Sequence, residues 1–455
     1  MSDPIVITTS GPAPDSLVTE QEYLEREASR PPVNSFGAVS NEAEFDSALA
    51  AGGVINLGGN TINCTGVKTV TKAWTTIIGP GHLRFVGIPK DTRCFLIQAS
   101  DVTLRDFELS SDEPPPFSLI GINFPSVAHR AKIQRLHIHN WGACITKYGG
   151  VTSPYINDIL IEDCYVHTFL FGGYMSFGLR RMLVQRCQFI GKLSGETHST
   201  WNAFYGAANL EDCRFENNEF GDVDKMGIEI TTVEGAEVVR PVLIQNRVFN
   251  CDTFGISLGH PQGAYVARNI VRNVKGIGIE MGGAIQTIGW ATVIDNDVEG
   301  VTNHPTGNGE AVAYILNRMR DSVMRGNRSA KISSSANPVW AYGTYIYESE
   351  RCSVIDGEFV DGGGLAIYVN PGSTGNTGGF HLLAGNSFRH TVNVVGGAAI
   401  HVGNTTVVAK NNTSWQKPGW SLGFRASCSA PARVECDAIP VTSGSFYGSN
   451  KVISA

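Results

Sequence analysis

A short phrase recurs along this chain: a few apolar positions, then Asn or Cys, one spacer and another apolar residue. Successive copies start 23 to 33 residues apart, which is too long for a helical turn and too short for a domain. Spacing of this kind is typical of supersecondary units stacked in a row, so the pattern predicts a solenoid. The copies, including weaker ones, begin at Cys164, Cys187, Cys213, Asn246, Asn269, Asn296, Asn327, Gly357, Asn386 and Asn411.

Short strands account for the residues between these copies. Apolar runs such as 159–161, 242–244 and 292–294 precede the phrase, and segments such as 227–230 and 255–258 follow it as Gly, apolar, any residue, apolar. The second kind of segment alternates with a period of two, whereas helical repeats need apolar residues three and four apart. The alternation therefore predicts an all-β chain, wound into a single-stranded parallel β-helix.

The Asn of the phrase has a structural explanation. A coil must turn sharply between two strands, and Asn tolerates the left-handed backbone conformation better than other residues that carry a side chain. Asn side chains on successive coils can also hydrogen-bond to one another along the axis. An element that repeats on every coil cannot mark a single site. We therefore expect this ladder to stabilise the scaffold and assign it no catalytic role.

Composition supports one long domain and excludes two classes of partner. Gly provides 52 of the 455 residues, 17% are charged and 42% are hydrophobic, which suits a long narrow core with many tight turns. The net charge of −7 and the lack of a Lys/Arg run argue against a nucleic-acid partner. No stretch of 18 uncharged apolar residues occurs, so no membrane span is expected.

The amino terminus lacks the basic region and the long apolar run of a secretory signal peptide, since it reads MSDPIVITTSGPAPDS. This suits a component of a virion tail, or another extracellular protein released by lysis. A cytoplasmic enzyme or one exported by an unconventional route is the alternative.

The ten cysteines do not indicate a disulfide framework. Cys164, Cys187 and Cys213 share one position on consecutive units, which predicts a buried ladder of reduced thiols. Only Cys428 and Cys436 lie close enough together, near the end of the chain, to suggest a bridge. No CxxC motif and no His-rich cluster with zinc spacing is present, so we expect no structural metal and no cofactor.

The chain divides into four segments. Residues 1–33 form an amino-terminal segment that is partly flexible and contains a short acidic helix over 17–29. Residues 34–75 form a cap, in which a capping-box-like start at 41–44 leads into a helix through about Ala51. The parallel β-helix occupies 76–410, and residues 411–455 form an irregular carboxyl-terminal segment.

The cap carries a family resemblance. Residues 36–39 read Phe-Gly-Ala-Val, a helix follows and ends in Ala-Gly-Gly, and residues 54–57 read Val-Ile-Asn-Leu before a turn. This order resembles the amino-terminal cap of pectate-lyase-like right-handed β-helices, and is most similar to phage tailspikes and exopolysaccharide depolymerases. The resemblance covers about residues 34–410. It implies a right-handed coil, a polysaccharide ligand and a homotrimer, and it leaves the reaction open among hydrolases, lyases and epimerases.

Two carboxylates are the leading catalytic candidates. Alternation places Glu229 and Glu280 on the outer face, with Glu229 in the column of Ser257 and Gly278, and Glu280 in the neighbouring column. Two coils and one outward position then separate the pair by about 12 Å at the backbone. Side chains that reach toward each other could shorten this to the roughly 6.5–9.5 Å of an inverting glycosidase.

Asp222 and Asp224, in the turn before Glu229, are alternative catalysts, although turns are rich in Asp for structural reasons. Aromatic rings can stack on sugar rings, and His260 follows the strand that carries Ser257. The residues that we expect to bind substrate are His260, Trp201, Tyr205, Trp340, Tyr345 and Tyr368.

Other reactions on this fold have motifs that can be compared with the sequence. The Arg-x-Pro-x-x-Arg signature of pectate-lyase-type enzymes is missing, and so is the Asp-Pro-His of alginate-epimerase-type enzymes. Of the galacturonase motifs only Gly259-His260 is present, followed by Pro261. By elimination, we favour a tailspike-like glycoside hydrolase that degrades bacterial capsular or secreted exopolysaccharide, as in biofilms. A lyase, an epimerase and a non-catalytic glycan-binding adhesin remain alternatives.

Overall fold

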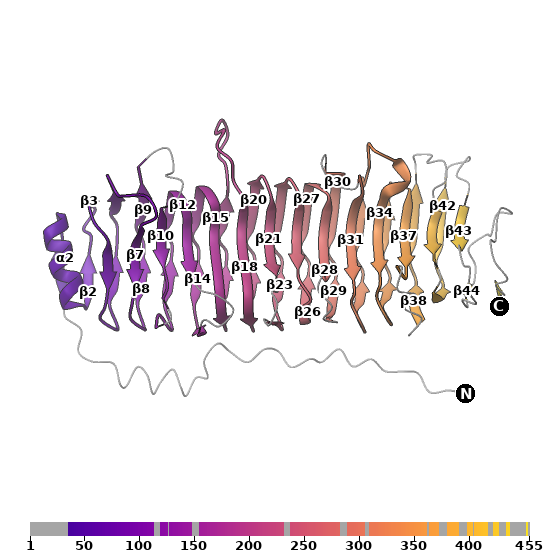
Figure 1. The fold of residues 1–455 in the computed structure, drawn as a ribbon, viewed down its shortest axis with the longest axis horizontal. Helices are drawn as coiled ribbons and strands as arrows, with labels where there is room; N and C mark the ends of the chain where they lie inside the picture. Colours follow the sequence, from indigo (N-terminus) through magenta and orange to yellow (C-terminus); the bar gives the residue numbers. More distant parts are fainter. Residues whose placement is uncertain are drawn as a thin grey trace.

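The structure is a computed structural model that extends as one row of stacked coils, with the chain advancing from one end to the other (Figure 1). Every pairing between the strands of the described residues is parallel, and the predicted right-handed parallel β-helix is confirmed. The described residues are 35–112, 119–125, 127–147, 154–231, 237–282, 289–304, 309–361, 364–372, 380–390, 398–403, 405–416, 422–426, 434–436 and 452–453.

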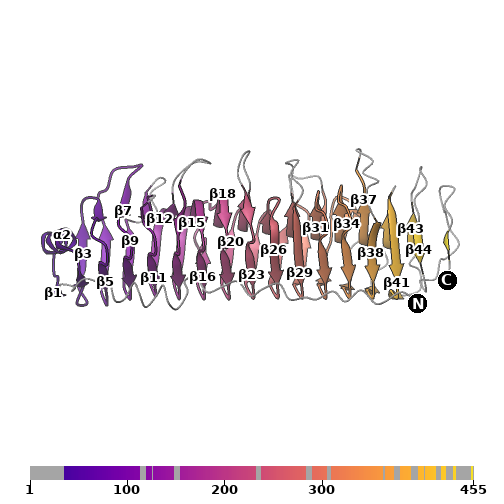
Figure 2. The same ribbon diagram turned by 90° about the horizontal axis from the view of Figure 1, so that it is seen from below.

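The strands form three ladders, each of which takes one strand or part of one strand from each coil (Figure 2). The first ladder consists of β1 (Ser35–Ala38), β2 (Val54–Asn56), β5 (Thr76–Ile78), β8 (Thr103–Arg105), β11 (Lys132–Gln134), β14 (Leu160–Glu162), β16 (Leu183–Gln185), β19 (Arg214–Glu216), β23 (Val242–Ile244), β26 (Gln262–Ala267), β29 (Trp290–Ile294), β32 (Val323–Arg325), β35 (Ser353–Ile355), β38 (Phe380–Ala384), β41 (Thr406–Lys410), β44 (Val434–Cys436) and β45 (Val452–Ile453).

The second ladder consists of β3 (Thr61–Cys64), β6 (His82–Phe85), β9 (Glu108–Ser111), the first part of β12 (His137–Lys147), the first part of β15 (Tyr165–Arg180), β17 (Gln188–Ile190), β20 (Glu219–Val223), β24 (Arg247–Cys251), β27 (Ile270–Lys275), β30 (Asp297–Thr302), β33 (Arg328–Ala330), β36 (Glu358–Val360), β39 (Ser387–His390) and β42 (Thr413–Gln416).

The third ladder consists of β4 (Lys68–Val70), β7 (Arg93–Ile97), β10 (Ile120–Asn123), the later parts of β12 and β15, β18 (Asn202–Glu211), β21 (Met226–Thr231), β25 (Phe254–Leu258), β28 (Ile277–Gly282), β31 (Ala311–Asn317), β34 (Ala341–Tyr347), β37 (Leu365–Asn370), β40 (Ala398–Val402) and β43 (Leu422–Ala426). Two short strands, β13 (Ile156–Asn157) and β22 (Val238–Val239), lie at the corner between the third and first ladders.

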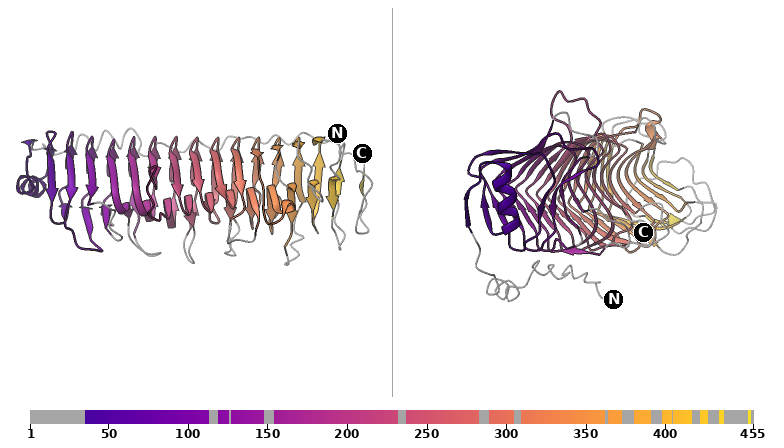
Figure 3. Two further views of the ribbon diagram at one scale, coloured as in Figure 1. Left: turned by 90° about the horizontal axis from the view of Figure 1, so that it is seen from above. Right: turned by 60° about the vertical axis from the view of Figure 1, so that its left-hand side comes forward.

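The helix α2 (Glu42–Ala51) closes the amino-terminal end of the solenoid, as the right-hand view of Figure 3 shows. Asn41 is its N-cap and accepts a hydrogen bond from the backbone N–H of Glu44, while Glu44 accepts one from the N–H of Ser40. The arrangement resembles a capping box, as the sequence predicts, except that Glu44 bonds to the residue before the N-cap. Phe45 and Leu49 are buried and cover the open end of the core. The predicted helix is therefore confirmed.

The stacked coils extend beyond the predicted β-helix segment 76–410 at both ends. Strand β2 pairs with β5 and β3 pairs with β6, so residues from Val54 onward already belong to the solenoid. At the other end β43, β44 and β45 continue the first and third ladders beyond residue 410. The expectations for residues 1–33 and for a Cys428–Cys436 bridge lie outside the described residues.

The interior is a narrow, mainly apolar column, and two ladders of side chains run along it at the recurring phrase. Cys164, Cys187 and Cys213 are buried free thiols, which confirms the reduced ladder. Farther along, Asn side chains pass hydrogen bonds from coil to coil: Nδ2 of Asn246 donates to Oδ1 of Asn269, and Nδ2 of Asn269 donates to Oδ1 of Asn296, both at 2.9 Å.

The turn itself differs from the expectation. The left-handed residue is the one before each ladder Asn, with φ of 57° at Gln245, 56° at Arg268 and 52° at Asp295. Asn therefore occupies this position for its inward hydrogen bonds, and the preceding exposed residue takes the left-handed conformation.

A 3-10 turn, η1 (Pro338–Trp340), leads into β34. Neither helical element among the described residues has the length and apolar character that a membrane crossing requires.

Candidate functional site

The third ladder places the two candidate glutamates in one outward column. Glu229 of β21 pairs with Ser257 of β25, and Ser257 pairs with Glu280 of β28. The expectation that Glu280 occupies a neighbouring column, beside Gly278, is wrong. The expectation matched Ser257 with Gly278, whereas the structure pairs Ser257 with Glu280 and places Gly278 beside Gly255. The true register therefore differs by two residues, which keeps Glu280 on the outer face but moves it by one column.

The shared column shortens the separation of the pair. Adjacent parallel strands lie about 4.8 Å apart, so two coils separate the backbones of Glu229 and Glu280 by roughly 10 Å rather than 12 Å. Ser257 is a small side chain between them. Only this small side chain, whose Oγ donates to Glu280, therefore separates the two glutamates along the column.

Glu229 is held by one neighbour on the preceding coil. Nδ2 of Asn202 donates to Oε2 of Glu229 at 2.7 Å, and Oδ1 of Asn202 accepts the backbone N–H of Met226 at 3.2 Å, which fixes the amide orientation. Burial raises the pKa of Glu229, while Asn202 and the charge of Lys225 act to lower it. Asn202 was not identified from the sequence.

Glu280 is the more protected carboxyl group. Oγ of Ser257 donates to its Oε2 at 2.6 Å. Burial raises the pKa of Glu280; the Ser257 hydrogen bond opposes this, and the nearby Glu229 charge raises the pKa further. A carboxyl group with a raised pKa beside a second carboxylate is the combination that general acid catalysis requires.

Aromatic residues stand on the amino-terminal side of the pair. Tyr205 of β18 pairs with Glu229 and continues the outward column by one coil. Trp201 is 49% exposed, contacts Phe171 edge to face and lies under the ammonium of Lys225, which is 5.2 Å from the ring centroid. Both predicted aromatic residues are thus brought to the acid pair.

On the carboxyl-terminal side the column continues through Ile315, Tyr345 and Tyr368. Tyr345 and Tyr368 stack with ring centroids 5.0 Å apart, but Tyr345 is only 8% exposed because it belongs to an apolar cluster outside the main core. Val339 of η1 packs on this cluster. Trp340 is 41% exposed. Of these predicted binding residues, Trp340 and the half-buried Tyr368 present ring surface to solvent.

The remaining predicted residues lie away from the column. Asp224 forms an ion pair with Lys192 at 2.6 Å and accepts the backbone N–H of Thr200. Burial acts to raise its pKa, but these two partners lower it overall, so Asp224 stays ionised. Asp222 accepts a hydrogen bond from Asn250 at 2.8 Å. His260 is 2% exposed at the corner after β25 and presents no surface to a polymer on the outer face.

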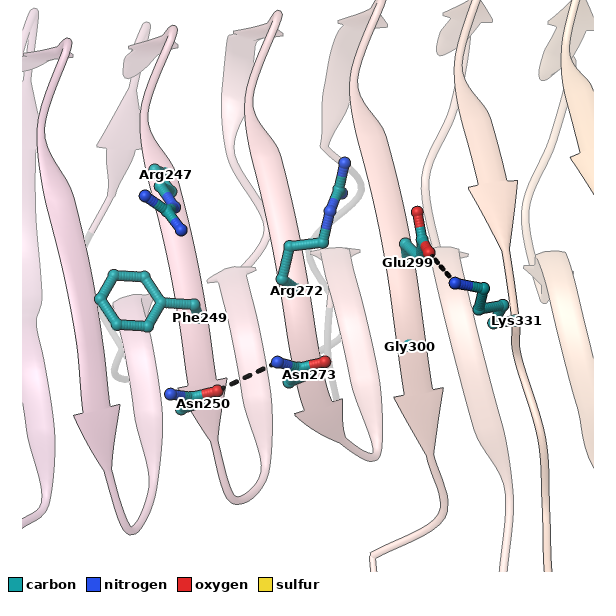
Figure 4. Close-up of a pocket in the computed structure, with 8 residues that line it drawn as sticks. All are labelled: Arg247, Phe249, Asn250, Arg272, Asn273, Glu299, Gly300 and Lys331. Atoms are coloured by element: carbon teal, nitrogen blue, oxygen red, sulfur yellow. Dashed lines mark hydrogen bonds and ion pairs between the residues drawn. The ribbon is translucent and has the colours of Figure 1, made fainter.

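A hollow of about 400 Å³ lies on the outer face of the second ladder, away from the acid pair (Figure 4). The figure shows its charged side chains on successive strands, with Glu299 bonded to Lys331 at 2.6 Å. The Lys331 hydrogen bond lowers the pKa of Glu299 despite some burial. An acid held ionised by an adjacent cation cannot serve as a proton donor, so this hollow lacks the chemistry of the acid column.

A second group of titratable residues was missed in the sequence. Glu108 of β9 and His137 and His139 of β12 place their ligand atoms within 4.8 Å of one another on the second ladder. These residues come from different coils, so no zinc-like spacing is visible along the chain. The sequence does contain one indication of this cluster: His137 and His139 alternate on one strand, and His167 pairs with His139 one coil later.

Comparison with known proteins finds similarity of structure alone. Neither a protein-family model nor a curated protein matches the sequence. Among solved structures, the tailspike protein gp208 of Dettilon has a TM-score of 0.52 and 13% identity, with 81% of this chain and 66% of that chain covered. The pre-mature gene product 12 of bacteriophage phi29 has a TM-score of 0.55 and 11% identity, with 89% and 63% covered.

A GH87 alpha-1,3-glucanase from Streptomyces thermodiastaticus aligns at a TM-score of 0.43 and 14% identity, over 92% of this chain and 67% of that one. The chain thus spans about two thirds of the length of each of these three structures. It shares the parallel β-helix fold with the two phage proteins.

Proposed function

We propose that this protein is an endo-acting polysaccharide depolymerase that hydrolyses glycosidic bonds of a bacterial capsular polysaccharide or exopolysaccharide. The observation that carries the proposal is the outward column in which Glu229 and Glu280 flank Ser257, with the pKa of both carboxyl groups raised. Glycoside hydrolysis requires two such carboxyl groups on either side of the scissile bond.

The surroundings of the two glutamates suggest different roles. Glu280 has its pKa raised by burial and by the charge of Glu229, so it suits the general acid that protonates the leaving oxygen. Glu229 accepts a hydrogen bond from Asn202 and lies near Lys225, both of which favour the ionised form, so it suits the base. If the two side chains lean toward each other from a backbone separation of roughly 10 Å, their carboxyl groups come within the roughly 6.5–9.5 Å of an inverting enzyme, in which water occupies the space between base and substrate.

The regularly spaced outward side chains of the third ladder suit the binding of an extended polymer. Outward side chains repeat about every 4.8 Å along the axis, and aromatic residues lie before and after the acid pair. Trp201 and Tyr205 on one side, and Tyr368 and Trp340 on the other, can stack on sugar rings through their exposed faces. A virion tail or another extracellular location is consistent with the fold shared with two phage proteins.

The test uses the full chain and a panel of purified bacterial capsular polysaccharides and exopolysaccharides. Solution viscosity and newly formed reducing ends are followed together, because an endo-acting enzyme lowers viscosity before many ends accumulate. Glu229→Gln and Glu280→Gln should each lower the cleavage rate by about 10²–10⁴-fold. Glu358→Gln, at an exposed strand position of the second ladder, is the matched control and should cleave at the wild-type rate.

Three outcomes would contradict parts of this proposal. Wild-type rates in both Gln variants, with Asp222→Asn or Asp224→Asn inactive, would move the chemistry to the preceding turn. Products that carry a new carbon–carbon double bond, detected by ultraviolet absorption, would identify a lyase. Binding of a polysaccharide without any cleavage would favour the glycan-binding adhesin.

We also propose that the chain assembles as a homotrimer. The proposal rests on the resemblance to tailspikes and on the long lateral faces that a solenoid offers for self-association. Light scattering should give a mass three times that of the 48.9 kDa chain. A stable mass of one chain at micromolar concentration would contradict it.

A further inference from the structure

Histidines gather on the outer face of the second ladder, in the amino-terminal third of the solenoid. His82, Glu108 and His137 occupy one outward column on successive coils. The adjacent column contains His139 and, one coil later, His167. Four imidazole rings and one carboxylate thus meet on four neighbouring strands, β6, β9, β12 and β15.

The ligand atoms of this cluster converge. Nε2 of His139 lies 2.8 Å from Oε1 of Glu108, and the ligand atoms of Glu108, His137 and His139 all lie within 4.8 Å of one another. Nε2 of His137 lies 2.7 Å from Nε2 of His167. Tetrahedral zinc with bonds of 2.0–2.1 Å needs ligand atoms about 3.3 Å apart. Small side-chain movements would therefore bring the ligand atoms of Glu108, His137 and His139 to coordination geometry, with His167 adjacent to His137.

A chain of hydrogen bonds orients the fourth imidazole. The hydroxyl of Thr168 donates its only proton to the carboxylate of Glu196 at 2.9 Å. The same oxygen lies 2.9 Å from Nδ1 of His167, so it must accept a proton from that nitrogen. Nε2 of His167 then carries a lone pair and faces the cluster. An imidazole held by its other nitrogen in this way is the usual arrangement of a metal ligand.

We propose that Glu108, His137 and His139 bind a divalent transition-metal ion of the zinc class, with His167 as the neighbouring fourth ligand. Three imidazole nitrogens and one carboxylate oxygen suit zinc, whereas calcium and magnesium prefer oxygen ligands alone. The proposal departs from the expectation of no structural metal, which considered only spacing within the sequence.

Burial and hydrogen bonding favour the protonation states in which these side chains can bind a metal ion. Burial lowers the pKa of His137, and it lowers the pKa of His167 to about 4. Both shifts favour the neutral form of His137 and His167. Burial acts to raise the pKa of Glu108, but the His139 hydrogen bond lowers it overall, so the carboxylate is ionised. Coordination needs neutral rings and an anionic carboxylate, which is the direction of these three shifts, and the convergence of the ligand atoms carries the proposal.

The metal would join three successive coils, because Glu108 lies in β9, His137 and His139 in β12, and His167 in β15. In a solenoid each coil contacts only its neighbours, so a bond between coils adds directly to local stability. The site lies on a different ladder from Glu229 and Glu280, and it does not depend on the proposed hydrolysis.

The experiment uses tag-free full-length protein that has been stripped with EDTA and dialysed. Titration with zinc chloride, followed by calorimetry, should show one ion per chain, and cobalt chloride should give the visible absorption of a tetrahedral site. Zinc should also raise the thermal unfolding temperature, since a ligand that binds only the folded state stabilises it. His139→Gln should weaken zinc binding by at least about 10-fold, because it removes a ligand. His304→Gln, a histidine outside the cluster, is the matched control and should bind zinc like the wild type.

Two results would overturn the proposal. The first is an unaltered protein that takes up no zinc or cobalt at micromolar concentration, which would leave the cluster as a stack of hydrogen-bonded rings. The second is uptake that is equal in wild type, His139→Gln and His304→Gln, which would place the ion elsewhere. The titration of the wild-type protein can contradict the proposed zinc site by itself, so the test does not depend on whether His139→Gln folds. Normal polysaccharide cleavage in a protein without zinc would leave the proposed hydrolysis intact.

Discussion

Two stacks of polar side chains run along this solenoid, one inside and one outside, and they differ in regularity. The inner stack repeats one residue type: Asn246, Asn269 and Asn296 bond to one another in the same way on successive coils. The outer stack on the third ladder changes at each coil, from Tyr205 through Glu229, Ser257 and Glu280. Repetition indicates a role that every coil needs, whereas a break in the repetition indicates a role that belongs to one place.

Hydrogen bonding separates the two stacks further. Oδ1 of Asn269 accepts the backbone N–H and the side-chain N–H of Asn246, and its Nδ2 donates to the carbonyl of Leu243. The amide is therefore satisfied on both sides. Glu280 has one short hydrogen bond, from Ser257, and a raised pKa. The inner stack is built for stability, and the outer one keeps a reactive group at a cost to stability.

The largest expected effect comes from breaking the inner stack. Asn269→Ala removes the acceptor of the buried Asn246 N–H and the donor to Leu243, and each unsatisfied buried group costs about 1–3 kcal/mol. We expect the free energy of unfolding to fall by about 3 kcal/mol, measured by urea denaturation. Asn63→Ala, at an exposed strand position, is the control and should change it by less than about 0.5 kcal/mol. Cleavage per folded molecule should be unchanged in both variants.

A smaller effect is expected at the edge of the outer stack. Trp201→Ala removes a ring that can stack on a sugar, and such aromatic contacts are worth about 0.5–1.5 kcal/mol. We expect KM for the cleaved polysaccharide to rise by about 2- to 10-fold with kcat little changed. Trp290→Ala is the matched control, because both Trp201 and Trp290 are 49% exposed but Trp290 lies on the first ladder. Equal changes in the two variants would argue against a polymer track on the third ladder.

The smallest effect is a pH dependence of stability. The pKa of Glu280 is raised in the folded protein, so the folded state holds this proton more tightly than the unfolded state. Stability from this group is complete below its ordinary value of about 4.5 and is lost as the pH rises through the raised pKa. Glu280→Gln, which cannot ionise, should therefore unfold at a higher temperature than wild type at pH 7. The two proteins should converge at pH 4, and a constant difference across this range would contradict the raised pKa.

Much of the fold could be predicted because it depends on repetition. The strand alternation, the Cys ladder and the N-cap at Asn41 are local patterns, and the structure has them where the sequence places them. The left-handed position was displaced by one residue, to Gln245 rather than Asn246, because the sequence shows which residues recur but not which of them takes a positive φ.

The candidate site was harder to predict, since it depends on register between coils. A two-residue error in matching β25 to β28 was enough to put Glu280 in the wrong column, although the pair itself had been chosen. The role of Asn202 could not be predicted, because its contact with Glu229 is between two coils and is not visible along the sequence. The cluster of Glu108, His137 and His139 was missed for the same reason, since its residues lie on different coils. Contacts between coils are set by loop lengths that no single repeat reveals.

The central claim is that Glu229 and Glu280 act together on one bond, and a double-mutant cycle tests it most directly. Cleavage rates of wild type, Glu229→Gln, Glu280→Gln and the double variant are compared on the same polysaccharide, with folding checked by circular dichroism. Residues that act as a unit have effects that do not add. The account predicts that the double variant is no slower than the slower single variant, within about 3-fold. A double variant whose loss equals the product of the two single losses would show that the two carboxyl groups work independently, and would contradict the catalytic pair.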